Sequence, residues 1–316
     1  MNTCAKNVIK IAFLSLGMGS CDVFAGNLPG MPDWNNFHPG LPAERECRPI
    51  HDAAKALDVA KVQQLVSQGA NINDKGCFFT MTPLQVALEV DYTMRPKDFW
   101  KFPSAIKPIP KDPAKAEAMA KWLLDNGAAR EINYQSADFL QTALHCAVDS
   151  NLPRVVQLLL DKGADPNIVM VDGSSALMMT ARDGLTECAR VLVNNTKTNL
   201  RQKMRNPMLD ANVDPHVESI HIAAFFNHPP IIDLLLQKGV SVNETDDFGN
   251  TALHYAAQVL SLDTARFLVS KGADKSLKNK DGLSALGEAA ATLKAQNPKI
   301  KDADLKVHPL IQLLMY

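Results

Sequence analysis

Four histidines in similar local surroundings carry the clearest chemical potential in this sequence, namely His51, His145, His221 and His254. A neutral imidazole can bind a metal ion or accept a proton, and His145 beside Cys146 resembles a general base next to a nucleophile. All four histidines, however, hold the same position in a short phrase that recurs along the chain. That shared position favours a structural role over a catalytic or metal-binding role.

The sequence lacks the motifs that mark common catalytic sites. It has no Walker A loop, no dinucleotide-binding glycine fingerprint, no G-x-S-x-G and no H-E-x-x-H. The segment 246–250 (DDFGN) is similar to half of a calcium loop, but no glutamate follows at the required place, so we interpret it as a turn. We therefore expect a protein that is not an enzyme, with no catalytic residue, no metal site and no cofactor.

Composition indicates a folded, soluble chain. Of its 316 residues, 46% are hydrophobic, and 33 Lys+Arg stand against 34 Asp+Glu for a formal net charge of −1. This balance gives no broad attraction to nucleic acid or to an acidic membrane surface, so we expect neither as a partner. By length alone the chain could form one large domain or two ordinary ones.

The first 25 residues have the layout of a secretory signal peptide. Lys6 and Lys10 precede a short apolar segment, 11–19, and small residues end at Ala25. No segment is long and apolar enough to predict a membrane span. We predict cleavage after Ala25 and export to a bacterial periplasm. Two alternatives stay open: secretion, or a lipoprotein anchored at Cys21, where the preceding residues resemble a lipobox.

One phrase recurs through the rest of the chain. It reads PIHDAA at 49–54, TPLQVA at 82–87, TALHCA at 142–147, SALMMTA at 175–181, SIHIAA at 219–224, TALHYAA at 251–257 and SALGEAA at 284–290. The apolar anchors of these phrases are spaced by 34, 60, 33, 43, 33 and 33 residues, from Ile50 to Leu286. A second phrase begins with glycine 19 residues after four of the anchors, at Gly69, Gly163, Gly239 and Gly272. Two markers locked to one 33-residue period indicate a repeat protein.

This pattern resembles the ankyrin repeat, and the resemblance extends over residues 47–316. It implies an all-α ankyrin-repeat solenoid of about seven repeats, each a β-turn finger followed by two antiparallel helices. It also implies that the histidines of the phrase bond the neighbouring turn. The residues agree, because hydroxyl side chains stand where helix N-caps are needed, at Thr82, Thr142, Ser175, Thr251 and Ser284. Glycines then stand where the second helices end.

Departures from the period divide the chain further. We predict a Pro/Gly-rich extension over 26–46 and two inserts within the repeats, at about 91–118 and 200–217. The first insert separates the two helices of the second repeat, and its prolines exclude one continuous helix. The second insert lengthens the finger ahead of the fifth repeat. The late arrival of the apolar segment 310–314 predicts a modified last repeat.

The resemblance implies that fingers and inner helices form the face that binds a partner. In the first insert we expect either a contact loop at Phe99, Trp100 and Lys101, or aromatic side chains folded back on the helices. The other predicted binding residues lie on the second insert and the inner helices: Arg182, Arg201, Lys203, Arg205, Phe225, Phe226, Tyr255 and Gln258. Phe225 and Phe226 either stand exposed as interface anchors or lie under the long finger.

We interpret the chain as a periplasmic scaffold that binds another protein, a toxin or an enzyme. The role we favour is an immunity protein that occludes the active site of a secreted toxin. The alternatives are an accessory protein for a periplasmic enzyme such as catalase, and a secreted effector that binds a host protein.

Four cysteines remain after the predicted cleavage, and two of them are placed to form a disulfide. Cys47 and Cys77 precede the first helices of adjacent repeats, so their turn segments can bring the two sulfurs together in an oxidising compartment. Cys146 and Cys188 are expected to be packed thiols.

Alkylation without reduction, followed by intact-mass analysis, should modify two fewer thiols than alkylation after reduction. Free thiols at both Cys47 and Cys77 in the non-reduced protein would contradict the prediction.

Overall fold

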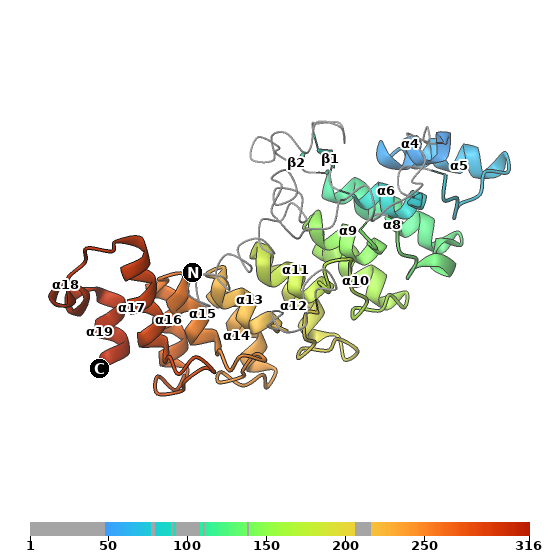
Figure 1. The fold of residues 1–316 in the computed structure, drawn as a ribbon. Helices are drawn as coiled ribbons and strands as arrows, with labels where there is room; N and C mark the ends of the chain where they lie inside the picture. Colours follow the sequence, from blue (N-terminus) through green and yellow to red (C-terminus); the bar gives the residue numbers. More distant parts are fainter. Residues whose placement is uncertain are drawn as a thin grey trace. The chain divides into compact units, whose positions relative to one another are not determined.

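The computed structural model describes residues 48–76, 80–89, 91–92, 108–109, 111–137, 139–205 and 216–316 (Figure 1). The predicted signal peptide and N-terminal extension, the predicted disulfide at Cys47 and Cys77, and most of the first insert lie outside these residues. Two compact units are distinguished, with their boundary between Met179 and Thr180, inside helix α11 (Ala176–Asp183). They are called here the N-terminal unit (48–179) and the C-terminal unit (180–316).

The N-terminal unit consists of paired helices. The pairs are α4 (Pro49–Lys55) with α5 (Val59–Ser67), α6 (Pro83–Leu88) with α8 (Pro113–Asp125), and α9 (Ala143–Asp149) with α10 (Pro153–Asp161), and a short 3-10 turn, η3 (Ala128–Glu131), follows α8. First helices pack on first helices, α4 on α6 and α6 on α9. Second helices pack likewise, α5 on α8 and α8 on α10. The result is two layers of helices with a shared core.

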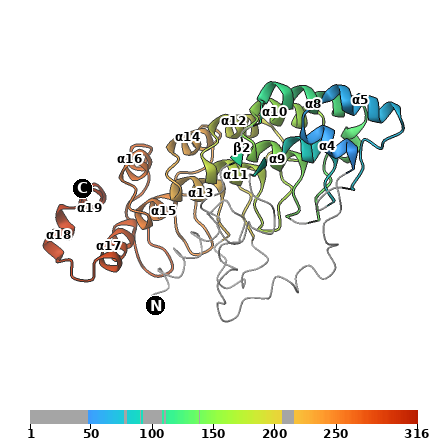
Figure 2. The same cartoon turned by 90° about the horizontal axis from the view of Figure 1, so that it is seen from above.

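The C-terminal unit follows the same plan. Its helices are α12 (Thr186–Asn194), α13 (Ser219–Phe225), α14 (Pro229–Gln237), α15 (Ala252–Gln258), α16 (Leu262–Ser270), α17 (Ala285–Gln296), α18 (Asp302–Val307) and α19 (Pro309–Met315). In Figure 2, α12, α14 and α16 form one side of this unit, and α13, α15 and α17 form the other. The late apolar segment 310–314 forms α19, which packs on α17, so the predicted modification of the last repeat is confirmed.

The first helices are short, and their N-termini are closed by the predicted hydroxyl caps. Thr142 Oγ1 accepts from the backbone N–H of His145, and the Nδ1 atom of His145 accepts from the backbone N–H of Thr142 at 3.1 Å. Thr251 and His254 form the same reciprocal pair. Each capping box satisfies N–H groups that a helix of six or seven residues would otherwise leave open. At the other end of the helix pairs, Gly163 and Gly239 adopt φ of 97° and 86°, the left-handed conformation predicted for them.

The anchors of the recurring phrase form the core. Six of them are at most 2% exposed: Ile50, Leu84, Leu144, Leu177, Ile220 and Leu253. The seventh, Leu286 on α17, is only half-buried. Helix α15 packs against two first helices, α13 and α17, whereas α17 packs against α15 and the second-layer helix α19. Leu286 is thus partly exposed on the last first helix of the described stack, whereas Ile50 is buried on α4, which packs against one described first helix, α6.

The first insert separates α6 from α8, as predicted, but it is shorter than predicted. Helix α8 begins at Pro113 with Asp112 as its cap, so residues 113–118 belong to the helix. The ends of the insert pair as short antiparallel strands, β1 (Asp91–Tyr92) and β2 (Pro108–Ile109). Lys111 Nζ then donates to the carbonyl oxygens of Val86 and Ala87 in α6, at 2.9 and 2.7 Å.

Replacing Leu253 by alanine should lower the free energy of unfolding by about 2–5 kcal/mol, because its buried side chain leaves a cavity between neighbouring helices. Urea unfolding followed by circular dichroism measures this change. Leu286→Ala is the matched control, and it should cost clearly less because Leu286 is half-buried. Equal losses at the two positions would contradict the assigned repeat register.

Candidate partner-binding surface

The recurring histidines are structural, as the sequence predicts. The Nε2 atom of each of three histidines lies within hydrogen-bond distance of a carbonyl oxygen in the following turn: His51 with Asp74 at 3.0 Å, His221 with Glu244 at 3.0 Å, and His254 with Leu283 at 3.1 Å. In His221 and His254, Nδ1 accepts from a backbone N–H, so Nε2 carries the proton and donates. Each imidazole thereby connects its own helix to the next turn.

Burial disfavours the charged form of three of the recurring histidines, His145, His221 and His254. It lowers the pKa of His145 to about 4, against smaller opposing effects of the Asp172 carboxylate and the Ile168 carbonyl. Burial also lowers the pKa of His221 and of His254. The His145–Cys146 pair is not a base–nucleophile pair, because His145 Nδ1 lies 2.8 Å from Thr142 Oγ1 and Cys146 Sγ faces Gln141.

The two cysteines in the described residues are packed in the interior as well. Cys146 and Cys188 are buried thiols, as predicted, and burial raises the pKa of Cys188 to about 12. Across the described part of the chain, no three His, Cys, Asp or Glu side chains are grouped as metal ligands would be.

Most of the binding residues predicted on α13 and α15 are buried. Tyr255 is 1% exposed, Gln258 3% and Phe225 9%, so Tyr255 and Gln258 are not available to a partner, and Phe225 is not the exposed anchor that was one of its two alternatives. The cause is close packing of α13 on α15, which places the Tyr255 ring against His221 and Phe225, with centroid distances of 5.5 and 6.4 Å. Phe226 is half-buried, more exposed than Phe225, and meets the Phe225 ring edge-on at a centroid distance of 5.1 Å. It is the accessible member of this set.

The predicted basic residues are largely engaged within the protein. Arg182 forms a two-pronged pair with the Asp183 carboxylate at 2.9 and 2.8 Å, and its side chain is 11% exposed. Arg201 donates to the Gly239 carbonyl at 3.2 Å and lies 3.6 Å from Glu244. Arg205 is exposed, whereas Phe99, Trp100 and Lys101 lie outside the described residues.

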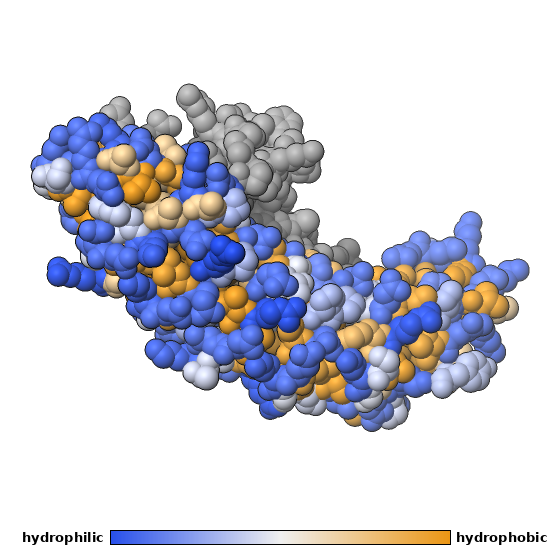
Figure 3. All heavy atoms as spheres, turned by 180° about the vertical axis from the view of Figure 1, so that it is seen from behind, coloured by the Kyte–Doolittle hydropathy of each residue, from blue (hydrophilic) through white to orange (hydrophobic). Residues whose placement is uncertain are grey.

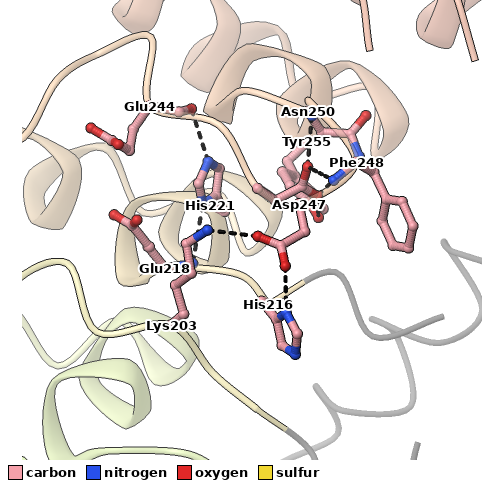
Figure 4. A network of polar contacts seen from close by, with 10 residues as sticks. Lys203, His216, Glu218, His221, Glu244, Asp247, Phe248, Asn250 and Tyr255 are labelled. Carbon is pink, nitrogen blue, oxygen red and sulfur yellow. Dashed lines mark hydrogen bonds and ion pairs between the residues drawn. The ribbon is translucent and has the colours of Figure 1, made fainter. Parts of the chain in front are cut away.

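A single carboxylate holds both ends of the second insert. Asp247 lies in the turn after α14, and its Oδ1 accepts from Lys203 Nζ at 2.6 Å while its Oδ2 pairs with His216 Nδ1 at 2.5 Å (Figure 4). Between these contacts, the backbone N–H of Met204 donates to the carbonyl of Val217 at 2.8 Å. Residues 203–204 and 216–217, called here the finger stem, are thus held together. Hydrogen bonds from Lys203 and His216 lower the pKa of Asp247.

Beside the finger stem, Glu218 occupies the N-cap position of α13, where α6, α9, α15 and α17 have Thr or Ser and α4 has Arg48. It is 3% exposed, and its Oε2 has no hydrogen-bond partner. Burial, and next the Glu244 carboxylate, raise the pKa of Glu218 to about 7. Sequence reasoning missed Glu218, His216 and Asp247. The available signal was the acidic residue at a position that is hydroxyl-bearing in five of the other six phrases.

The neighbouring Asp246 closes the same turn from inside. Its carboxylate accepts from Tyr255 Oη at 2.6 Å and from the backbone N–H groups of Phe248 and Asn250 at 2.9 and 2.7 Å. Burial raises the pKa of Tyr255, so its hydroxyl remains a donor. Asp246 therefore ties α15 to the turn that carries Asp247.

Exposed apolar side chains are spread over the described surface and are not concentrated at the turn that carries Asp246 and Asp247. On the face shown in Figure 3, hydrophobic areas alternate with hydrophilic ones. Among the described residues, the large hydrophobic side chains that are exposed are Leu140, Val307, Met315 and Tyr316. No described helix combines the length and the apolar character needed to cross a membrane.

Comparison with known proteins identifies the repeat. Residues 220–298 match the family described as "Ankyrin repeats (3 copies)", and residues 140–170 match "Ankyrin repeat". The chain is 31% identical over 155 residues to the nuclear factor NF-kappa-B p105 subunit of Gallus gallus, covering 48% of this chain and 15% of the relative. It is 29% identical over 139 residues to the neurogenic locus notch homolog protein 1 of Homo sapiens, covering 44% and 5%. The chain thus spans only a small part of these curated relatives.

Solved structures show the same architecture. The human ASB11 ankyrin repeat domain is similar with a TM-score of 0.60 at 23% identity, covering 85% of this chain and 97% of that domain. The ankyrin repeat domain of Bcl-3 is similar with a TM-score of 0.61 at 22% identity, covering 86% and 100%. The predicted all-α ankyrin-repeat fold is confirmed.

His145→Gln should make stability less sensitive to acid. Between pH 6.5 and about 4 the unfolded chain binds a proton at residue 145 that the folded chain does not, so stability falls as the pH falls through this window. The full effect is about 3 kcal/mol. Gln85 shows that glutamine fits this position, since its Oε1 accepts from Thr82 N at 2.9 Å. Urea unfolding at pH 7 and pH 4 compares the variant with the parent; parallel losses in the two proteins would refute the assignment.

Proposed function

Because the chain contains ankyrin repeats, which serve as scaffolds for protein–protein interaction, we propose that it is an exported scaffold that inhibits a secreted toxin by covering its active site. Such a protein acts by occlusion and needs no catalytic residue of its own. The signal-peptide layout of residues 1–25 supports export to the periplasm. Acylation at Cys21 would keep the same scaffold at a membrane surface.

The observation that carries binding is the accessible, pre-positioned ring of Phe226. It directly follows α13, in edge contact with Phe225, which is itself buried against Tyr255. The next residue, Asn227, is held through its Oδ1 by the hydroxyls of Ser261 and Thr264, each at 2.6 Å. An aromatic side chain fixed in this way loses little conformational entropy on binding, and such rings are favoured interface anchors.

Two other roles use the same surface. An accessory protein would bind a periplasmic enzyme such as catalase without blocking it, and a secreted effector would bind a host protein. The partner itself distinguishes these roles from inhibition. A toxin gene beside this gene supports the inhibitor, and a catalase gene supports the accessory protein.

Phe226→Ala should weaken capture of the partner by about tenfold or more, because an aromatic anchor typically contributes above 1 kcal/mol. The mature chain is used as bait in periplasmic extract, the captured protein is identified, and its Kd is measured for parent and variant. Phe267→Ala is the matched control, since Phe267 is a half-buried ring on α16 in the other helix layer. Unchanged affinity for Phe226→Ala, or equal loss for both variants, would exclude this surface.

Inhibition has its own readout. The captured protein is assayed for activity with and without the mature chain. Loss of its activity supports the inhibitor, whereas unchanged or increased activity refutes it and favours the accessory role.

A further inference from the structure

Among the described residues, four carboxyl groups and four basic groups lie near the finger stem. The carboxyl groups are those of Glu218, Glu244, Asp246 and Asp247, and the basic groups are Arg201, Lys203, His216 and His221. Burial lowers the pKa of His221. Its Nδ1 accepts from the backbone N–H of Glu218 at 3.1 Å, and its Nε2 lies 3.0 Å from the Glu244 carbonyl. His221 therefore offers no positive charge to the cluster.

Each remaining cation is already engaged. Lys203 Nζ is 2.6 Å from Asp247, and Arg201 donates to the Gly239 carbonyl while lying 3.6 Å from Glu244. His216 Nδ1 is held by Asp247 Oδ2. Asp246 is satisfied by Tyr255 and the backbone of its own turn.

Among the described residues, Glu218 forms no ion pair, although the positive charges of Lys203 and Arg201 act to lower its pKa. A hydroxyl at this cap, as in Thr142 or Thr251, closes the helix without bringing charge into the core. A carboxylate that is 3% exposed, with Oε2 unpartnered and Glu244 nearby, is disfavoured by desolvation and by repulsion. The protonated carboxyl avoids both penalties. The raised pKa of Glu218, about 7, agrees with this geometry.

We propose that Glu218 is a proton-operated latch for the finger stem. With the proton present, Lys203 and His216 both stay on Asp247, and the two ends of the insert are held together. When the proton leaves, the Glu218 carboxylate attracts the ammonium of Lys203, whose side chain is 47% exposed and free of core packing. Asp247 then retains only His216, and the 203–204 end is released.

The folded state favours the protonated form of Glu218, so folding stability must decrease as the pH rises. Between about pH 4.5 and 7 the folded chain keeps a proton that the unfolded chain releases. The stability that Glu218 contributes is therefore fully present below pH 4.5 and is lost as the pH rises through 7. The latch concerns the finger stem alone and stands whether or not the finger contacts a partner.

Amide hydrogen exchange at Met204 tests the latch, because the Met204 N–H spans the finger stem to Val217. NMR on the full-length parent and on Glu218→Gln gives protection factors at pH 6 and 8.5, corrected for the intrinsic exchange rate. In the parent, protection should fall by about tenfold or more, since the protonated fraction falls tenfold for each pH unit above the transition. In Glu218→Gln, a permanently neutral isostere, it should stay nearly constant.

Two controls separate the latch from general loosening. The Met170 amide donates to the Ser174 carbonyl in a turn of the N-terminal unit, and its protection should not change over this pH range. Asp247→Asn weakens the contacts of both Lys203 and His216, so Met204 should be poorly protected at both pH values. A constant protection factor at Met204 in the parent, or the same fall in Glu218→Gln, would overturn the proposal.

The proposal can also be tested in the parent protein alone, by titrating Glu218 directly, in case a variant does not fold. The carboxyl ¹³C shift of Glu218 in the parent should titrate with the same midpoint as Met204 protection. A midpoint near that of an ordinary exposed glutamate would also overturn the proposal.

Discussion

A pair of short helices cannot bury its own apolar side, so each repeat depends on its neighbours for a core. The anchors show this dependence directly. Leu253 is 1% exposed because α15 has a first helix on each side, whereas Leu286 on α17 is half-buried. The polar groups obey the same constraint. The imidazoles of His221 and His254 reach from one repeat to the carbonyls of the next turn, so hydrogen bonding and apolar packing both run between repeats.

This arrangement leaves turns and helix ends as the places where the chain can vary. At α13 the usual hydroxyl cap is replaced by Glu218, and the turn that follows α14 supplies Asp247 to hold the finger stem. Neither residue contributes to the apolar core. Both lie where neighbouring repeats meet. The features that differ between repeats thus lie at turns and helix ends, around a core built from the same recurring anchors.

Much of the fold could be predicted because it follows from local pattern. The cap at Thr142 and the left-handed Gly163 are determined by neighbours within one repeat, and the recurring phrase marks Leu253 as an anchor that the adjacent helices α13 and α17 bury. Counting residues between markers also placed the first insert between α6 and α8. The details of the site depended on contacts that counting does not reveal. Tyr255 and Phe226 both looked available, yet helix packing buries the first and leaves the second half-buried.

The contacts around the first insert have a consequence for how this protein can change. The β1–β2 pair joins the two ends of the insert, Lys111 satisfies the carbonyls of Val86 and Ala87, and Ser150 Oγ donates to Leu88 at 2.5 Å. The carbonyls at the end of α6 are therefore satisfied by residues outside the segment 93–107. Because closing a longer loop adds little entropic cost, that segment can gain or lose residues without disturbing its repeat. This position is a natural graft point, where new binding sequence can be introduced while the scaffold remains unchanged.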